Sequence, residues 1–188
     1  MNLRILAVSG SLRSGSSNTA VLRAAQLLAP PGVEVALYDA LADLPAFNPD
    51  LDQPGFPLPR AASDLRARVA RAHALIICSP EYAHGIPGAL KNLLDWLVGS
   101  EAFPGKPVML VAASERSCSA QAQLAEVLRT MSARLVFTES VVVPVPSRTM
   151  GAATIAADPR LGEVLRGAIG ALMQAVVRPT FPTPGTFP

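Results

Sequence analysis

Glycines and hydroxyl-bearing residues crowd one short segment near the start of the chain. An apolar stretch ends at Ser9, and the next ten residues read GSLRSGSSNT, with a helical pattern that starts at about Asn18. A helix N-terminus presents unpaired backbone N–H groups and a partial positive charge, and Ser11, Ser17 and Thr19 add further donors. We therefore expect this turn to bind an anion, with phosphate as the natural candidate.

The spacing within this segment narrows the choice of phosphate. Gly10 to Ser17 reads GxxxxGSS, which is close to a nucleoside triphosphate loop, but Ser16 stands where that loop has its lysine. The GxGxxG spacing of a dinucleotide site is absent, as is the cysteine and arginine pair of a low-molecular-weight tyrosine phosphatase. A terminal monophosphate remains. The alternatives are that Ser16, Ser17 and Asn18 only cap a helix and that Arg13 is only solvated.

A second segment reads SPEYAHGIPGALKNLLDW from Ser79 to Trp96 and follows another apolar stretch. In a parallel α/β sheet, loops at the carboxyl ends of neighbouring strands flank the same crevice. Tyr82 offers an aromatic wall there, and Gly85 and Gly88 allow the backbone to approach a flat ring closely. A phosphate held by the first segment would place the rest of its molecule against this one.

The elements that must position these loops alternate along the chain. Apolar runs predict strands at Leu3–Val8, Val33–Tyr38, Ala74–Ser79, Val108–Ala113 and Leu135–Val143, and helical periodicity predicts helices near residues 18–28, 65–72, 90–98, 124–131 and 161–176. Nearly continuous apolarity in the third strand indicates a strand covered on both faces. Because no second βαβαβ half follows, we predict an α/β, flavodoxin-like three-layer sandwich with a five-stranded parallel sheet of order 2-1-3-4-5.

Composition limits the classes of protein that the chain can represent. The 188 residues are 50% hydrophobic, and the net charge of +2 is scattered, which argues against nucleic-acid binding. No apolar run reaches the ~20 residues that cross a bilayer, and the short start around Arg4 is a strand and not a signal peptide. Cys78 and Cys118 suit free thiols in the cytoplasm. We expect one domain over residues 1–177 and a proline-rich tail over residues 178–188.

The two segments GSLRSGSSNT and SPEYAHGIPGALKNLLDW resemble the NADPH-dependent FMN reductase family, which includes chromate, quinone and azo-dye reductases. The resemblance runs from Leu3 to about Val143. It implies that the first loop binds the FMN phosphate through Ser11, Arg13, Ser17, Asn18 and Thr19. It implies that the second loop wraps the isoalloxazine through Pro80, Glu81, Tyr82, His84, Gly85 and Ile86. Ser114 is expected on the third side, where the family usually has a glycine-rich turn and this chain has none.

The resemblance implies an FMN-dependent NAD(P)H oxidoreductase. Hydride would pass from NADPH or NADH to flavin N5, and electrons would then pass to a quinone, an azo compound, a metal oxyanion or free flavin. Because the cofactor carries the chemistry, no catalytic side chain and no metal are expected. Two substrates that share one flavin face predict ping-pong kinetics. The alternatives are a flavodoxin-type electron carrier, which the charge of +2 disfavours, and a flavin-binding sensor without nicotinamide turnover.

The helix at Leu90–Val98 carries more apolar surface than one core contact needs. Leu90, Leu93, Leu94 and Leu97 already form one stripe, so Trp96 and Val98 fall on other faces. We predict a two-fold homodimer, possibly assembled further into a tetramer, with Trp96 at the interface and the flavin sites nearby. The alternative is that the Pro45–Pro59 loop of the same chain covers these side chains.

Overall fold

A parallel sheet forms the centre of the computed structural model, which describes residues 2–147 and 149–177. Its hydrogen-bonded order is β2 (Val33–Tyr38), β1 (Leu3–Ser9), β3 (Ala74–Cys78), β4 (Pro107–Ala112) and β5 (Arg134–Leu135). Every neighbouring pair of strands is parallel. The predicted order 2-1-3-4-5 is therefore confirmed.

The predicted fifth strand lies at the expected edge but is divided in two. Besides β5, a second short strand, β6 (Val141–Val142), pairs with β4 further along. Leu135 pairs with Val108 and Val141 pairs with Val111, so residues 136–140 stand opposite only residues 109–110 of β4. The intervening segment therefore bulges out of the sheet. At an edge strand this is possible because no further strand needs its backbone groups.

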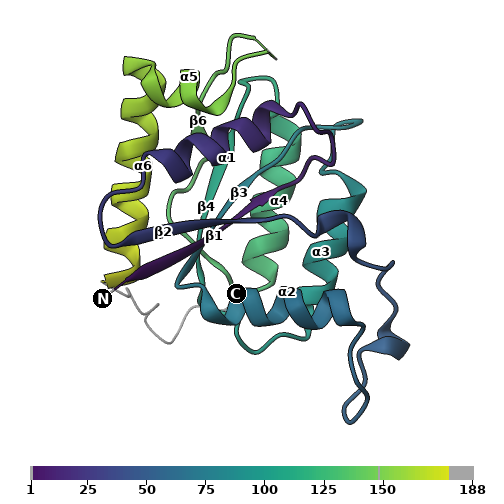
Figure 1. Cartoon of the computed structure of the whole chain (residues 1–188). Helices are drawn as coiled ribbons and strands as arrows, with labels where there is room; N and C mark the ends of the chain where they lie inside the picture. The colour runs from purple at the N-terminus through teal and green to yellow at the C-terminus, as the bar shows by residue number, and fades with distance from the viewer. Residues whose placement is uncertain (1, 148, 178–188) are drawn as a thin grey trace.

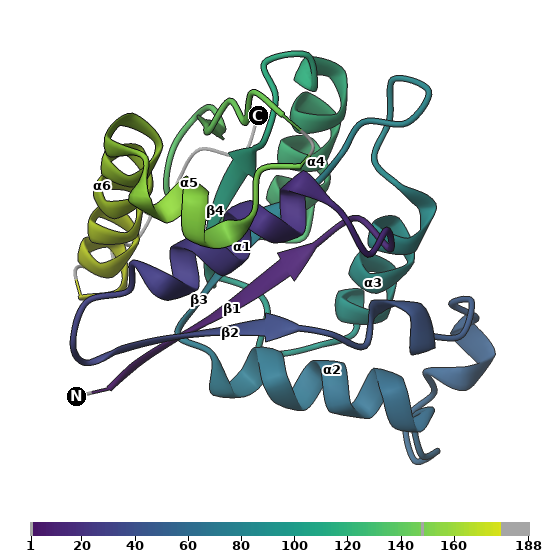
Figure 2. The same cartoon turned by 45° about the horizontal axis from the view of Figure 1, so that its top comes forward.

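Helices cover both faces of the sheet, as Figures 1 and 2 show. On one face lie α1 (Ser17–Leu27), α5 (Ala152–Ala157) and α6 (Pro159–Val177), and on the other lie α2 (Arg60–Arg71), α3 (Gly88–Val98) and α4 (Cys118–Thr130). Alternate residues of each central strand enter the two cores: Ile5 and Ala7 face α1, whereas Leu6 and Val8 face α2 and α3. The three-layer, flavodoxin-like sandwich is thus confirmed.

The Pro45–Pro59 segment covers α3, which corrects the expectation for Trp96. Trp96 is fully buried within its own chain. Its indole Nε1 donates to the Pro45 carbonyl oxygen at 2.8 Å, and the Phe47 ring packs edge-on against it with centroids 5.0 Å apart. Trp96 is therefore a core residue and not an interface anchor, whereas Val98 remains 66% exposed.

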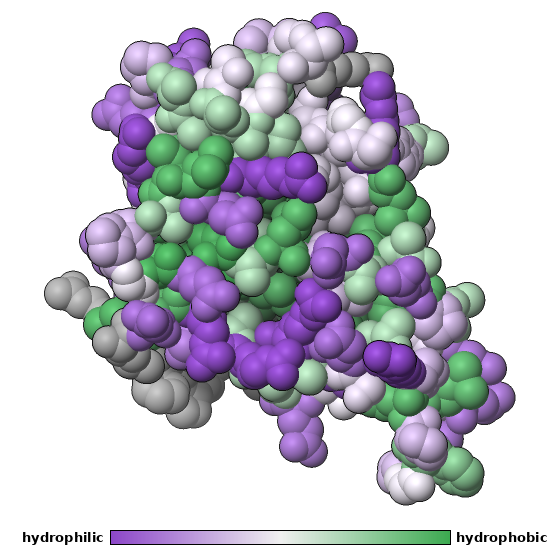
Figure 3. All heavy atoms as spheres, viewed as in Figure 1, coloured by the Kyte–Doolittle hydropathy of each residue, from purple (hydrophilic) through white to green (hydrophobic). Residues whose placement is uncertain are grey.

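The Pro45–Pro59 segment includes one short 3-10 turn, Pro49–Leu51, and another, Leu41–Asp43, lies just before it. It projects at the lower right of Figure 1, and the same region of Figure 3 carries apolar surface. Leu51 and Phe56 of this segment are exposed.

Within the described residues, no helix combines the length and apolarity needed to cross a membrane. The division at residue 177 stays a prediction, because the tail 178–188 lies outside the described residues.

Candidate functional site

A cavity of about 740 Å³ opens at the carboxyl ends of β1, β3 and β4. Three loops form it: the first loop (residues 10–16), the second loop (residues 79–87) and the third loop (residues 113–117). Its lining comprises Ser11, Arg13, Gly15, Ser16, Ser17, Asn18, Pro80, Glu81, Tyr82, Ala113, Ser114, Arg116, Ser117, Val145 and Pro146. The size is that of sites for small ligands and cofactors, and the place is where open parallel sheets bind them.

The start of α1 faces this cavity without a cap from its own chain. Ser16 occupies the N-cap position with extended backbone angles, yet its side chain makes no capping hydrogen bond. The Ser16 hydroxyl is buried and has no hydrogen-bond partner among the described residues. A buried polar group without a partner is costly, and this one stands where helix N–H groups also lack acceptors. The turn therefore fits an anion with several oxygen acceptors, as a phosphate has.

The buried thiol of Cys78 holds the Asn18 side chain in place. The Cys78 sulfur donates to Asn18 Oδ1 at 3.3 Å. Burial raises the pKa of Cys78 to about 12, so the thiol keeps its proton at neutral pH and can donate it to Asn18. Thr19 points elsewhere: its hydroxyl lies 2.8 Å from the Ser9 hydroxyl, and the residue does not line the cavity.

Two arginines supply positive charge at the cavity. Arg13 comes from the first loop and Arg116 from the third, and both are exposed. Neither forms an ion pair with a carboxylate of residues 2–147 or 149–177. A guanidinium without a carboxylate partner is available for a phosphate group.

The first and second loops touch directly at Gly10. A Cβ atom placed on Gly10 would lie 2.6 Å from Ser79 Oγ and 3.1 Å from a methyl carbon of Leu90. The Gly10 N–H also donates to the Cys78 carbonyl oxygen at 2.9 Å. A side chain at this position would push the two loops apart, so the glycine keeps both walls of the cavity in register.

The tip of the second loop is a tight two-residue turn. Tyr82 and Gly85 exchange two backbone hydrogen bonds of 3.0 Å, and the residues between them, Ala83 and His84, have φ angles of 50° and 60°. Both thus adopt the left-handed conformation of a type I′ turn, which usually selects asparagine and glycine. Tyr82 lines the cavity but remains 57% exposed, so its ring stands at the rim.

Helix α4 holds the second loop through two hydrogen bonds. The carboxylate of Glu81 accepts a hydrogen bond from the Ala120 N–H at 2.9 Å, in the first turn of α4, and Gln123 Oε1 accepts from the Ile86 N–H at 2.8 Å. His84 Nδ1 lies 3.3 Å from the other Glu81 oxygen, although the His84 side chain is 87% exposed. The Glu81 carboxylate is thus engaged in contacts with other parts of the protein.

The third loop closes the cavity without a glycine. Its backbone turns at Ser114, whose hydroxyl accepts from the Arg116 N–H at 3.2 Å. This side-chain hydrogen bond shapes a turn that a glycine would otherwise permit. Ser117 then leads into α4.

Eight of the twelve predicted cofactor residues line this cavity: Ser11, Arg13, Ser17, Asn18, Pro80, Glu81, Tyr82 and Ser114. Thr19, His84, Gly85 and Ile86 lie outside its lining, and their contact with a flavin stays a prediction. Sequence reasoning did not assign Val145 and Pro146, which follow β6. Because the carboxyl ends of parallel strands lie at one edge of the sheet, the residues that follow the last strand could have been predicted at this cavity as well.

Comparison with known proteins agrees with this architecture. The family model for NADPH-dependent FMN reductase matches residues 3–146. The chain is 34% identical to the quinone reductase of Escherichia coli K12 over 166 residues, which is 87% of this chain and 85% of that protein. It is 39% identical to an NAD(P)H-dependent FMN reductase of Pseudomonas aeruginosa over 60% of each chain.

Among solved structures, a flavoenzyme NAD(P)H:(acceptor) oxidoreductase from Paracoccus denitrificans matches with a TM-score of 0.72 and 25% identity, over 94% of this chain and 98% of that one. The match of the family model covers all three loops of the cavity. The residues present fit FMN, because an uncapped helix start, a buried hydroxyl and two guanidinium groups, all without partners among the described residues, line one cavity of suitable size. The chain belongs to the NADPH-dependent FMN reductase family, whose enzymes use FMN together with NADPH or NADH.

Proposed function

We propose that the protein transfers electrons from NADPH or NADH to a small acceptor of the quinone class. The observation that carries this proposal is the cavity of about 740 Å³ at the carboxyl ends of β1, β3 and β4, with its uncapped α1 N-terminus. The similarity to the Escherichia coli quinone reductase over 87% of the chain supports the choice of acceptor. Azo compounds, metal oxyanions and free flavin are further candidate acceptors.

The residues of the first loop would hold the FMN phosphate. Ser16 and Ser17 offer hydroxyl and backbone donors at the start of α1, and Arg13 adds a charge. The backbone of Pro80–Tyr82 and the third loop form the walls that remain for the ring system. FMN, when bound, supplies the capacity to take up two electrons from a nicotinamide and to release them to an acceptor.

The ionisable members of the described lining are Arg13, Glu81, Tyr82 and Arg116. The Glu81 carboxylate accepts a hydrogen bond from the Ala120 N–H. Because the cofactor carries the chemistry, we expect the protein to act by binding and orientation. Two substrates that stack in turn on one exposed flavin face would give ping-pong kinetics, in which the oxidised nicotinamide leaves before the acceptor binds.

Rapid mixing and steady-state kinetics test this proposal. Anaerobic mixing of the FMN-loaded protein with NADPH or NADH should bleach the flavin absorbance band, and later addition of a benzoquinone should restore it. Initial rates at several quinone concentrations should give parallel reciprocal plots. A flavin band that neither nicotinamide bleaches would instead support an electron carrier or a sensor, and converging plots would contradict the ping-pong order.

We also propose a homodimer, possibly a tetramer, and a cytoplasmic location. The buried Trp96 side chain does not support the dimer. The support is membership of the family together with the exposed Tyr82 ring at the cavity rim, which a partner subunit would cover. The location rests on Cys78 and Cys118, which are both free thiols. Light scattering at micromolar protein should give twice or four times the chain mass of 19.6 kDa, whereas 19.6 kDa itself would contradict assembly.

A further inference from the structure

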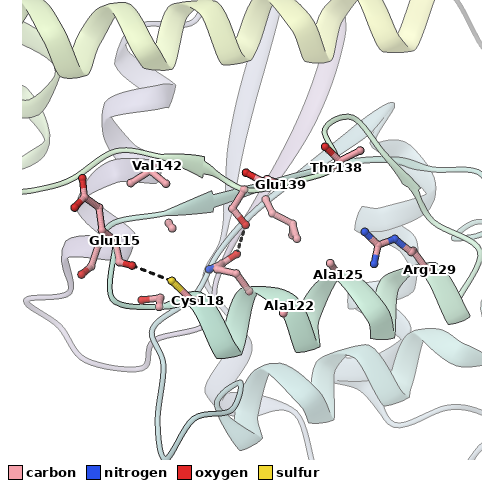
Figure 4. Close-up of a pocket in the computed structure, with 14 residues that line it drawn as sticks. Glu115, Cys118, Ala122, Ala125, Arg129, Thr138, Glu139 and Val142 are labelled. Carbon is pink, nitrogen blue, oxygen red and sulfur yellow. Dashed lines mark hydrogen bonds between the residues drawn. The ribbon is translucent and has the colours of Figure 1, made fainter.

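A second cavity, of about 480 Å³, lies between α4 and the segment that bulges out between β5 and β6. It exists because residues 136–140 leave the sheet and uncover Leu110 of β4. Figure 4 shows Ala122 and Ala125 of α4 along one side and Val142 on the opposite side. The small alanine side chains of α4 leave this space open where larger side chains would fill it.

The floor of this cavity contains a polar group without a partner. Gln121 is only 8% exposed, and its Oε1 accepts a hydrogen bond from the Ser140 hydroxyl at 2.6 Å. The other end of the same amide, Nε2, is buried and has no hydrogen-bond partner among the described residues. A buried N–H donor without an acceptor is costly, so a ligand that brings an oxygen acceptor would gain from it.

The charges around the cavity disfavour an anionic ligand. Glu115 lies at one end, Glu139 lies between the ends, and Arg129 lies at the other end, as Figure 4 shows. Two carboxylates against one guanidinium give the lining a net negative charge, which would repel a carboxylate or phosphate. The walls formed by Leu110, Ala125 and Val142 are apolar.

We propose that this second cavity binds a small, neutral, mostly apolar ring compound through a carbonyl oxygen that accepts a hydrogen bond from Gln121 Nε2. The apolar walls bury the ring, and the amide fixes its orientation. The site is separate from the flavin cavity but shares Ser114 and Ser117 with it, so a ligand here touches the loop that walls the flavin. This inference does not depend on the identity of the electron acceptor.

A pair of probes that differ only in the carbonyl group tests the proposal. The probe is 1-indanone, a bicyclic ketone that is not a quinone, and its control is indane, which has the same rings without the oxygen. Binding is measured by titration calorimetry on the FMN-loaded protein. We expect 1-indanone to bind roughly tenfold more tightly than indane, as one added hydrogen bond allows.

Two substitutions locate the binding. Gln121→Leu keeps the volume but removes the amide, so 1-indanone should lose its advantage while indane binds at least as well as before. Ala122→Phe, at an exposed position, should fill the cavity and abolish the binding of both probes. Thr130→Phe is the matched control, because Thr130 is an exposed residue of α4 outside the lining.

The flavin absorbance band and the far-ultraviolet circular dichroism of each variant show whether the fold and the first cavity are intact. Equal affinity for 1-indanone and indane in the unaltered protein would overturn the role of the amide. Unchanged binding of 1-indanone in Ala122→Phe would place the compound elsewhere, for instance at the open flavin face, and would overturn the proposal as a whole.

Discussion

The carboxylate of Glu81 and the backbone N–H of Ala120 form a hydrogen bond of 2.9 Å between the second loop of the flavin cavity and helix α4. Ala120 lies in the first turn of α4, where backbone N–H groups lack acceptors within the helix. The side chain of the N-cap residue Ser117 makes no capping hydrogen bond to them. A carboxylate from the second loop thus caps the helix that follows the third loop. The stability of α4 and the position of the second loop therefore depend on the same contact.

Glu81→Ala should lower the free energy of unfolding by about 1–2 kcal/mol, the usual cost of a lost N-terminal cap. It should also weaken FMN binding, because the second loop loses an anchor. Glu81→Gln keeps an oxygen that can accept from Ala120 and should retain most of both properties. Chemical denaturation and flavin fluorescence titration measure the two effects. Equal behaviour of the alanine and glutamine variants would contradict the capping role.

Trp96→Phe should destabilise the fold without changing assembly. The variant loses the hydrogen bond from the indole Nε1 to the Pro45 carbonyl, which keeps the one from Asn92 Nδ2, and the smaller ring leaves a space in the core, at a cost of about 1–3 kcal/mol. Trp96→Glu would bury a charge next to Phe47 and should prevent folding. Thermal unfolding and light scattering of Trp96→Phe give the measurement. A folded variant with unchanged melting temperature but altered mass would restore Trp96 as an interface residue.

Ala83→Gly should make the protein slightly more stable. Ala83 has a φ of 50°, a conformation that costs a residue with a Cβ atom roughly 1–2 kcal/mol and glycine almost nothing. The greater flexibility of glycine in the unfolded chain offsets part of this, so we expect a gain of up to about 1 kcal/mol. Ala61→Gly, in the first turn of α2, is the control and should lower stability. A loss of stability in Ala83→Gly would contradict the turn geometry.

Tyr38 links stability to alkaline pH. Burial, followed by the negative charge of Asp64, raises the pKa of Tyr38 to about 12 from an ordinary value of 10. Between these values the unfolded chain releases the proton while the folded chain keeps it, so the free energy of unfolding falls as pH rises from 10 to 12. Tyr38→Phe should reduce this fall. Cys78, whose pKa burial also raises to about 12, keeps its own contribution in both proteins.

At neutral pH the same variant should cost less than about 1 kcal/mol, because the buried Tyr38 hydroxyl has no hydrogen-bond partner among the described residues. Denaturation curves at pH 7 and across pH 9–12 provide both comparisons. Identical pH profiles for the two proteins would show that Tyr38 titrates normally in the folded state.

Alternation of apolar runs and helical periods was sufficient to predict the sheet order and the positions of the main helices, because each run of residues such as Ala74–Cys78 must be covered on both faces. The division of the fifth strand could not be predicted in this way. Residues 136–140 mix Phe137 with polar residues, and only the pairing with β4 shows that they leave the sheet.

The two cofactor loops could be identified from residue types, but the direction of each side chain could not. Ser17 and Thr19 look equivalent in sequence, yet only Ser17 lines the cavity, because the Thr19 hydroxyl pairs with Ser9. Trp96 looked like surplus apolar surface because its cover, around Phe47, lies some fifty residues away in sequence. Such long-range contacts have no local signal.

We propose that the uncapped start of α1, with the buried Ser16 hydroxyl, holds the FMN phosphate. Comparing FMN with riboflavin, which lacks the phosphate, isolates that contact. Fluorescence titration of the apoprotein gives both dissociation constants, and Ser14→Ala is the control, because Ser14 is an exposed residue of the same loop that does not line the cavity.

Ser16→Ala should weaken FMN binding roughly 10- to 150-fold, as expected for a hydrogen bond to a charged group, and leave riboflavin binding unchanged. Ser14→Ala should change neither. Two results would contradict the placement of the phosphate at the start of α1. One is that Ser16→Ala weakens the binding of FMN and of riboflavin by the same factor, and the other is that it leaves FMN binding unchanged.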